Sequence, residues 1–290
     1  MKIVTCRVYG GLGNQLFCYA AARALSVRNG AKLKIDNISG FINDVEYKRT
    51  YRLDNFNIPC EKTNTPYSRY KLKILKLLSR YFKIGKNRYI QQVNIDYDPN
   101  IIQLKVNNDL YIEGYWQSER YFQAFQDLIR EDFSFRTPMS PQNQKTYDKI
   151  SSCEAISLHI RRGDYISDQN TFNTHGVCSM DYYEKALEFI YRQCNNPVLF
   201  VFSDDMAWVK ENFNFDKQSY FIENNCGDDS YNDMRLMSSC KHHILANSSF
   251  SWWGAWLNSS AEKVVVTPRC WFASDRFDTR DLIPAEWIKL

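Results

Sequence analysis

Groupings that hold catalytic metal ions are scarce in this sequence. Its four histidines, His159, His175, His242 and His243, show no H-x-x-x-H spacing, and no D-x-D pair stands beside a glycine-rich turn. Metal sites in enzymes often draw on such spacings. We therefore expect no metal cofactor, and we expect arginine side chains and backbone dipoles to neutralise any anionic leaving group.

Long apolar runs and disulfide patterns are also missing. No run approaches the roughly 18 residues of a membrane-spanning helix, and residues 1–6 enter a strand pattern at once, without the features of a signal peptide. The nine cysteines are odd in number and show no C-x-x-C spacing, which favours free thiols over a disulfide framework. These absences predict a cytoplasmic protein that is soluble or peripheral to a membrane.

The length and the order of the predicted elements indicate an α/β protein with two domains. The 290 residues are 44% hydrophobic, which suffices for two cores of about 130 residues each. Residues 2–9 read as a strand, 14–28 as an alanine-rich helix and 32–35 as a second strand, which is a βαβ start. Further along, we expect a strand at 110–113, a helix at 119–130 and a proline-bearing linker at 136–144.

After the linker the alternation of strands and helices begins again. We expect strands at 155–160, 197–202, 219–222, 242–246 and 263–267, with helices at 181–194, 205–212, 231–240 and 252–258. Two such runs predict two Rossmann-like domains that face each other across a cleft. We assign residues 1–140 to the N-terminal domain, 141–267 to the C-terminal domain and 268–290 to a segment that packs back on the body.

Charge is unevenly distributed along the chain. The net charge is +4, but residues 61–90 hold nine Lys or Arg and one acidic residue, so this segment carries +8 and the rest of the chain −4. Within residues 69–83 the basic side chains recur at helical spacing opposite an apolar face. This amphipathic helix either makes peripheral contact with an anionic membrane or is an ordinary surface helix with its lysines in water.

Two adjacent arginines, Arg161 and Arg162, emerge from a predicted buried strand and are followed by the turn Gly163-Asp164. Charges at the carboxyl end of a strand lie where open α/β sheets bind ligands. The planar arginine fork donates two parallel hydrogen bonds to phosphate oxygens. Two interpretations fit these residues, a clamp for a dianion and a structural ion pair with Asp164.

A glycine-rich turn follows the first predicted strand, at residues 10–15. Gly11 and Gly13 permit close approach of a ligand to the start of a helix, and Asn14 and Gln15 add polar groups. A dinucleotide fingerprint is disfavoured because Leu16 stands where its third glycine belongs. The motif indicates polar recognition, with helix capping by Asn14 as the alternative.

Two further polar turns follow predicted strands of the second domain. Asp204 and Asp205 end one strand, where carboxylates either hold nucleoside hydroxyls and base edges or cap the next helix. Asn247, Ser248 and Ser249 precede Phe250 at another strand-to-helix junction. Amides and hydroxyls at such a junction bind phosphate. Capping of the helix by serine uses the same groups, so both interpretations remain.

Taken together, five motifs closely resemble those of the bacterial α-1,2-fucosyltransferases, and they span nearly the whole chain. They are Gly-Gly-Leu-Gly-Asn-Gln-Leu-Phe at 10–17, Gly-Tyr-Trp-Gln-Ser-Glu-Arg-Tyr-Phe at 114–122, His-Ile-Arg-Arg-Gly-Asp-Tyr at 159–165, Phe-Ser-Asp-Asp at 202–205 and Asn-Ser-Ser-Phe-Ser-Trp-Trp at 247–253. The arginine motif is shared with other fucosyltransferases, whereas the first and last motifs point to the α-1,2 group.

This resemblance implies a GT-B-like architecture and an inverting transfer of fucose from GDP-L-fucose to O2 of a terminal β-galactose in a glycan, without a metal. It places the donor on the C-terminal domain, with Arg161 on the β-phosphate and Arg162 assisting or holding the turn. Ser248, Ser249 and Phe250 match the turn that contacts the diphosphate and the nucleoside. Asn14 and Gln15 would then line the acceptor side of the site.

The catalytic base is less clear from the sequence. Asp164 and His159 are the nearest candidates to the arginines. Related α-1,6 enzymes use a glutamate beyond the arginine motif, whereas this chain offers Asp168 and no glutamate there. An Asp164 that only orients Arg161 or His159 fits equally well.

Three alternatives remain for the function. They are a fucosyltransferase of another linkage, α-1,6 or α-1,3, a non-catalytic carbohydrate- or nucleotide-binding module, and a Rossmann oxidoreductase, which Leu16 disfavours. We expect no nucleic acid partner, and nothing in the sequence indicates the oligomeric state. Loops at 37–60 and 91–118 are expected to select the acceptor, but their residues do not identify it.

Overall fold

The computed structural model describes the chain except for residues 64–69, 71, 75–76, 78–87 and 274–277 and the side chains of Asp164 and Ser167. The chain forms two compact units. The first is Met1–Thr137 with Arg280–Pro284, and the second is Pro138–Thr279 with Ala285–Leu290. The predicted basic helix at 69–83 falls mostly outside the described residues.

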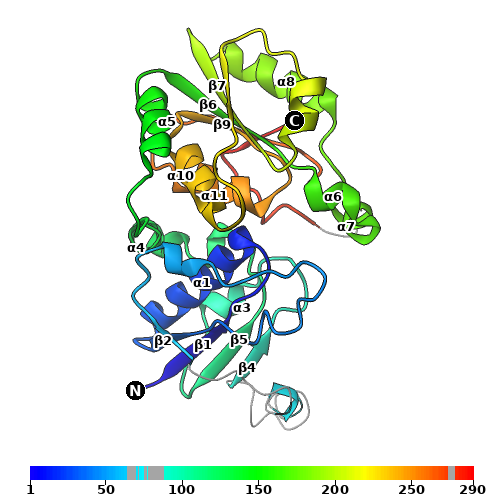
Figure 1. Cartoon of the computed structure of the whole chain (residues 1–290). Coiled ribbons are helices and arrows are strands. Elements are labelled where there is room, and N and C mark those ends of the chain that lie inside the picture. The colour runs from blue at the N-terminus through cyan, green and yellow to red at the C-terminus, as the bar shows by residue number, and fades with distance from the viewer. Residues whose placement is uncertain (64–69, 71, 75–76, 78–87, 274–277) are drawn as a thin grey trace. The chain divides into compact units, whose positions relative to one another are not determined.

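The first unit is built on a five-stranded parallel sheet in the order β3-β2-β1-β5-β4 (Figure 1). Its strands are β1 (Ile3–Arg7), β2 (Lys32–Asp36), β3 (Glu61–Lys62), β4 (Tyr89–Gln91) and β5 (Leu110–Glu113). Between β1 and β2 runs α1 (Leu12–Arg28), whose alanine-rich sequence favours a helix and allows it to lie close to the sheet. The predicted βαβ start is confirmed.

Short helices complete the first unit. They are α3 (Pro99–Ile102), α4 (Gln126–Asp132) and the 3₁₀ turns η1 (Leu53–Asn55), η2 (Glu119–Tyr121) and η3 (Gln123–Phe125). The single helix predicted at 119–130 is therefore wrong. Ser118 starts η2 by accepting the backbone N–H of Arg120, and the regular α-helix α4 begins only at Gln126.

The second unit carries a six-stranded sheet in the order β11-β10-β9-β6-β7-β8, also parallel throughout. Its strands are β6 (Glu154–Ile160), β7 (Pro197–Ser203), β8 (Ser219–Ile222), β9 (His242–Ile244), β10 (Val265–Thr267) and β11 (Ile288–Lys289). The five strands predicted after the linker are all present. The expected fold class, α/β with two Rossmann-like units, is confirmed.

Helices cover both faces of this sheet. The helices of the second unit are α5 (Pro141–Ser151), α6 (Gly163–Ser167), α7 (Gln169–His175), α8 (Met180–Tyr191), α9 (Met206–Asn212), the 3₁₀ turn η4 (Gly227–Ser230), α10 (Tyr231–Ser239) and α11 (Ser249–Leu257). Leu158 and Val201 pack with α8 and α9 on one face. Phe200 and Phe202 pack with α5 and α10 on the other. Because side chains alternate along a strand, both faces of β6 and β7 are buried, as parallel sheets require.

The predicted linker at 136–144 is shorter than expected. Helix α5 begins inside it, because Ser140 accepts the backbone N–H of Asn143 at 3.2 Å and Pro141 occupies the first helical position. A serine cap followed by proline is a strong helix start. Beyond residue 267 the chain contributes Arg280–Pro284 to the first unit and β11 to the second.

All nine cysteines lie among the described residues and all are free thiols. Among the described residues, no helix is both long enough and apolar enough to cross a lipid bilayer.

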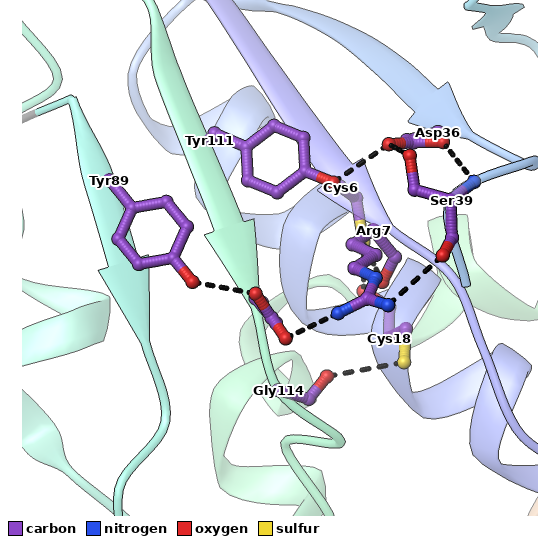
Figure 2. Close-up of polar contacts among 9 residues, drawn as sticks. Cys6, Arg7, Cys18, Asp36, Ser39, Tyr89, Tyr111 and Gly114 are labelled. Carbon is purple, nitrogen blue, oxygen red and sulfur yellow. Dashed lines mark hydrogen bonds and ion pairs between the residues drawn. The ribbon is translucent and has the colours of Figure 1, made fainter. Parts of the chain in front are cut away.

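A buried polar network fixes the strand ends of the first unit (Figure 2). Arg7 at the end of β1 pairs with Glu113 at the end of β5 at 2.5 Å and donates to the backbone oxygen of Ser39 at 3.0 Å. Asp36 at the end of β2 is fully buried and accepts hydrogen bonds from the hydroxyls of Ser39 and Tyr111. These contacts hold together the loops that leave the carboxyl edge of the sheet.

Replacement of Asp36 by alanine should weaken the first unit. The change leaves the backbone N–H of Ser39 and the hydroxyl of Tyr111 without their acceptor, and we expect a loss of about 3 kcal/mol in the free energy of unfolding. Asp109→Ala is the matched control, because Asp109 is exposed and accepts one backbone hydrogen bond. Urea titration followed by circular dichroism measures both, and equal midpoints for the two variants would contradict the role of the network.

Candidate functional site

The two central loops of the second sheet leave it in opposite directions. β6 leads to β7 on one side, whereas β9 leads to β10 on the other. The two strands pair in parallel with Leu158 opposite Ile244, so Arg161 and Asn247 follow neighbouring strand ends. Open α/β sheets bind ligands at such a switch point. The tertiary structure thus brings the predicted arginines and the predicted serine turn to one edge.

Arg161 is held in an ion pair with Asp204. Its Nη1 lies 3.0 Å from Oδ2 of Asp204, because β6 and β7 pair in register and the residues that follow them meet. The guanidinium also lies over the ring of Tyr165, 5.4 Å from the centroid. The Arg161 side chain remains 28% exposed. It is therefore oriented by its neighbours and still accessible to an anionic ligand.

Arg162 is more firmly held by protein contacts. Its Nε lies 3.4 Å from Oδ2 of Asp205, and its guanidinium carbon lies 3.4 Å from the ring centroid of Trp208. Its backbone N–H donates to Oδ1 of Asp204 at 2.9 Å. Of the two roles expected for Arg162, these contacts favour holding the turn.

The two carboxylates after β7 have separate tasks. Asp205 caps α9 by accepting the backbone N–H of Trp208 at 3.3 Å, whereas Asp204 pairs with Arg161. A Cβ atom on Gly163 would lie 2.3 Å from Oδ2 of Asp204, so glycine is required where the carboxylate approaches the backbone. The alternative ion pair with Asp164 stays a prediction, because the side chain of Asp164 lies outside the described part of the structure.

Asn247 acts as a structural tie. Its Nδ2 donates to the backbone oxygens of His175 and Trp271, at 2.9 and 3.2 Å. Its Oδ1 accepts from the thiol of Cys178, and the side chain is almost fully buried. Both ends of the amide are engaged, so the expected ligand contact by this side chain does not fit the structure. The Tyr165 hydroxyl donates to the Asn247 backbone oxygen at 3.1 Å, which joins the two loops.

The serine turn forms the start of α11. The Oγ of Ser248 accepts the backbone N–H of Phe250 at 3.3 Å, so Ser248 is the helix cap. Ser249 and Phe250 are half-buried. The hydroxyl of Ser249 and the first amides of the helix remain suited to an anion. Capping and phosphate binding are therefore compatible here, as the sequence indicates.

His159 is buried behind the arginines. Its ring lies 5.9 Å from that of Phe250, and burial together with the nearby Arg161 lowers its pKa to about 3. The imidazole is therefore neutral at physiological pH. Among the described residues its Nδ1 has no hydrogen-bond partner. A group with so low a pKa is a weak proton acceptor, which works against His159 as the base.

In the first sheet, β1 and β5 lie side by side. These strands pair in parallel with Cys6 opposite Ile112, so the loops that follow them lie together. Tyr9 from one loop stacks on Tyr115 from the other, with ring centroids 4.5 Å apart. Gln117 donates to Oδ1 of Asn14 at 2.8 Å. Tyr115 and Gln117 lie in the loop 91–118, which was expected from the sequence to select the acceptor. Their contacts with Tyr9 and Asn14 were not predicted, because the order of strands in the sheet is not written in the sequence.

The glycine motif of the first unit is only partly available to a ligand. Gln15 is buried, and its amide donates to the backbone oxygens of Gly10 and Thr50 and accepts the N–H of Arg52, each at 2.9 Å. It is a structural residue, which corrects the expected contact with the acceptor.

Asn14 does not cap the helix that follows it. Gly11 is the N-cap of α1, and no side-chain hydrogen bond caps this helix. The capping alternative for Asn14 is therefore wrong. Gly11 and Asn14 are half-buried, and Gly13 is buried in the first turn of α1.

A buried amide and carboxyl cluster lies after β8 and was not recognised in the sequence. Asn225 exchanges hydrogen bonds with Asn143 and donates to Oδ1 of Asp233 at 2.7 Å. Burial raises the pKa of Asp233 to about 7. Spacing does not reveal such a cluster, because its members come from α5, the loop after β8 and α10.

Three potential metal ligands lie together at the opposite, amino-terminal edge of the same sheet. The ligand atoms of Glu154, Cys194 and His242 lie within 4.8 Å of one another. The backbone N–H of Val264 donates to Nδ1 of His242 at 3.0 Å, so the neutral ring carries its proton on Nε2. Glu154 pairs with Lys241. This cluster is separate from the arginine site.

Comparison with known proteins finds a glycosyltransferase family and related glycosyltransferases. The model of the family described as Glycosyl transferase family 11 matches residues 3–290. An Escherichia coli α-1,2-colitosyltransferase is 34% identical over 100% of this chain and 99% of its own length. The O-antigen biosynthesis glycosyltransferase WbnK of Escherichia coli is 33% identical over 97% and 98% of the two chains.

A mammalian enzyme and a solved plant structure are also similar to this chain. The galactoside α-(1,2)-fucosyltransferase 2 of Mus musculus is 32% identical over 88% of this chain and 68% of its own. Among solved structures, a mutant of Arabidopsis thaliana FUT1 in complex with GDP has a TM-score of 0.50 at 11% identity, covering 91% of this chain and 70% of that one. That likeness concerns the fold alone.

Asp233→Asn should stabilise the second unit at high pH. Because the folded pKa is about 7 and the ordinary value is 3.8, the folded protein binds the proton more tightly, and stability falls as pH rises from about 4 through 7. At pH 8 we expect the variant to gain up to about 4 kcal/mol over the unmodified protein, and at pH 4 little or nothing.

Urea midpoints of the two proteins at pH 4 and pH 8 provide the measurement. Asp229→Asn is the control, since Asp229 is exposed in η4. A difference between Asp233→Asn and the unmodified protein that does not change with pH would contradict the raised pKa.

Proposed function

Because the chain belongs to glycosyl transferase family 11, we propose that this glycosyltransferase moves L-fucose from GDP-β-L-fucose to O2 of a terminal β-galactose in a glycan. The observation that carries the proposal is Arg161, oriented by Asp204 and Tyr165 at the switch point of the second sheet and still accessible to an anion. A diphosphate leaving group is the ligand that such a guanidinium fits best.

The names of the relatives support the proposed linkage. The colitosyltransferase and the mouse fucosyltransferase, which are 34% and 32% identical to this chain over the aligned residues, are both named for an α-1,2 linkage. The mouse enzyme is named for a galactoside, and WbnK for O-antigen biosynthesis. We therefore propose synthesis of a surface polysaccharide, such as an O-antigen, as the setting.

Colitose is a second candidate donor sugar. The relative named as an α-1,2-colitosyltransferase spans the whole of this chain. Colitose is fucose without the hydroxyl at C3, so the two donors share the diphosphate and the nucleoside that the second unit is proposed to bind. The choice between them depends on one hydroxyl group.

The proposed reaction is a direct displacement. The acceptor hydroxyl attacks the anomeric carbon on the side opposite the departing GDP, so a β-linked donor gives an α-linked product. Arg161 and the amides at the start of α11 neutralise the charge that develops on the diphosphate. One such preorganised donor is worth about 3 kcal/mol in the transition state. This arrangement is the reason we propose that no metal ion takes part.

Asp164 is the proposed base. It lies in the first turn of α6, which directly follows the two arginines, whereas His159 is buried and has a pKa of about 3. The carboxylate would take the proton of the attacking hydroxyl as the bond to the anomeric carbon forms. The acceptor is proposed to lie on the first unit, beside Asn14.

We propose, from the sequence alone, that the basic segment 69–83 contacts an anionic membrane. Most of this segment lies outside the described residues. Such a contact would bring the enzyme to a lipid-linked acceptor on the cytoplasmic face.

The proposal is tested by incubating the protein with GDP-fucose, or with GDP-colitose, and a panel of β-galactosides in the presence of EDTA. We expect GDP release that depends on the acceptor and an α-1,2-linked product by NMR. Faster turnover of GDP-colitose would select the second candidate. Absence of transfer from either donor to any galactoside would refute the proposed function.

Two variants separate the proposed roles of Arg161 and Asp164. Arg161→Ala should lower kcat/KM by about 10² to 10³ and weaken GDP binding. Asp164→Asn should slow transfer while GDP binding stays unchanged, because the base does not touch the leaving group. Calorimetry with GDP and initial rates measure the two effects. Arg192→Ala, on an exposed arginine paired with Glu188, is the matched control. Near-normal turnover in a folded Arg161→Ala protein would contradict the assignment.

A further inference from the structure

The motif at residues 114–122 is not used by the donor site. It follows β5, and its second residue, Tyr115, stacks on Tyr9 from the loop after β1. Both rings are half-buried. Gly10 between the strand and the helix has φ +77°, and a Cβ there would lie 3.1 Å from both Asn14 and Tyr115. The two loops are thus built to meet closely at this point.

A chain of neutral hydrogen-bonding groups runs across the junction. The side chain of Asn14 hydrogen bonds to the hydroxyl of Tyr115, and Oδ1 of Asn14 accepts from Nε2 of Gln117 at 2.8 Å. Burial raises the pKa of Tyr115 to about 12, so its hydroxyl stays protonated at neutral pH. Within the described part of the chain, these contacts leave the hydroxyl proton of Tyr115, and Oε1 and the second amide proton of Gln117, able to hydrogen bond to a ligand.

Contacts around Trp116 hold the turn that presents these groups in a strained backbone conformation. Trp116 has φ +55°, a conformation that a bulky residue adopts at a cost of about 1 to 3 kcal/mol. Gln92, just after β4, accepts its backbone N–H at 2.9 Å, and the buried indole packs edge-on against Tyr121. A Cβ on Gly114 would lie 2.5 Å from the side chain of Gln92, so only glycine fits at position 114 beside Gln92.

Open space lies beside Gly11, next to this chain of groups. A Cβ on Gly11 would meet no atom within 4 Å, although Gly11 lies next to the crowded Gly10. Arg7 and Glu113, beside Tyr9, are paired with each other. Arg49 and Asp44 lie near Tyr115, and Asp44 accepts the backbone N–H of Arg49. The groups of the junction itself, which are aromatic rings, amides and a hydroxyl, carry no charge at neutral pH.

We propose that Tyr9, Asn14, Tyr115 and Gln117 form a binding subsite for a neutral pyranose, and that Gln92 is a positioning residue that holds the Gly114–Gln117 turn in its strained form. An amide and a hydroxyl side by side match two neighbouring sugar hydroxyls, and an aromatic ring matches the apolar face of the sugar. The subsite rests on the proposed function, in which this sugar is the terminal β-galactose of the acceptor.

The binding residues are tested in Gln117→Ala and Tyr115→Phe. Each change removes one or two hydrogen bonds to the sugar, so we expect the KM for the galactoside to rise about three- to tenfold. The KM for GDP-fucose and the affinity for GDP should not change. An unchanged acceptor KM in both variants would overturn the subsite.

The positioning residue is tested by comparing three variants of neighbouring glutamines. Gln92→Ala loses the acceptor for the Trp116 N–H and should raise the galactoside KM to a similar extent. Gln92→Glu keeps an oxygen in place and should restore most of the affinity. Gln91→Ala, at an exposed position at the end of β4, is the matched control. Equal KM values in Gln92→Ala and Gln91→Ala would overturn the positioning role.

Binding is also measured without catalysis. Saturation-transfer NMR with methyl β-galactoside should show contact in the unmodified protein and a weaker signal in Gln117→Ala. If transfer fails but the sugar binds, the proposed function is wrong and the subsite stands. If transfer succeeds but the unmodified protein shows no Gln117-dependent sugar contact, the subsite is wrong and the function stands.

Discussion

Parallel pairing of β6 with both β7 and β9 is the constraint on which the proposed donor site of this protein depends. The pairing aligns three strand ends, so loops that are distant in sequence begin beside one another. Arg161 meets Asp204 because both residues follow paired positions. The ion pair orients a guanidinium that would otherwise sample many rotamers, and partial exposure leaves it able to exchange the carboxylate for a phosphate. The local burial that neutralises His159 follows from the same arrangement.

The first unit repeats this principle with neutral groups. Pairing of β1 with β5 brings Tyr9 to Tyr115 and Asn14 to Gln117. At the strand ends, Arg7 is paired with Glu113, and Asp36 accepts hydrogen bonds from its neighbours (Figure 2). One unit therefore offers an accessible cation and the other a set of hydroxyl and amide groups. That division of chemistry matches a transfer between an anionic donor and an uncharged acceptor.

Much of this could be read from the sequence, and the errors have physical causes. Strand and helix periodicity located the central strands of both sheets but not the short β3, β4 and β11, and the motifs located the loops that leave the central strands. Roles within a motif were harder. Gln15 and Asn247 look like ligand-binding residues in sequence, but each amide is buried and engaged by backbone groups. Asp204 and Asp205 are adjacent and chemically identical, yet only one faces Arg161 while the other caps a helix.

The sequence by itself determined the α/β class, the family resemblance and the residue types available for chemistry, because periodicity and glycine-rich turns are local properties of the chain. Only the tertiary structure decided which of those residues meet. The order of strands in a parallel sheet is set by long-range burial on both faces and leaves no local mark in the sequence. For that reason the partner of Arg161, the strained turn at Trp116 and the junction of Tyr115 with Asn14 emerge only from the folded chain.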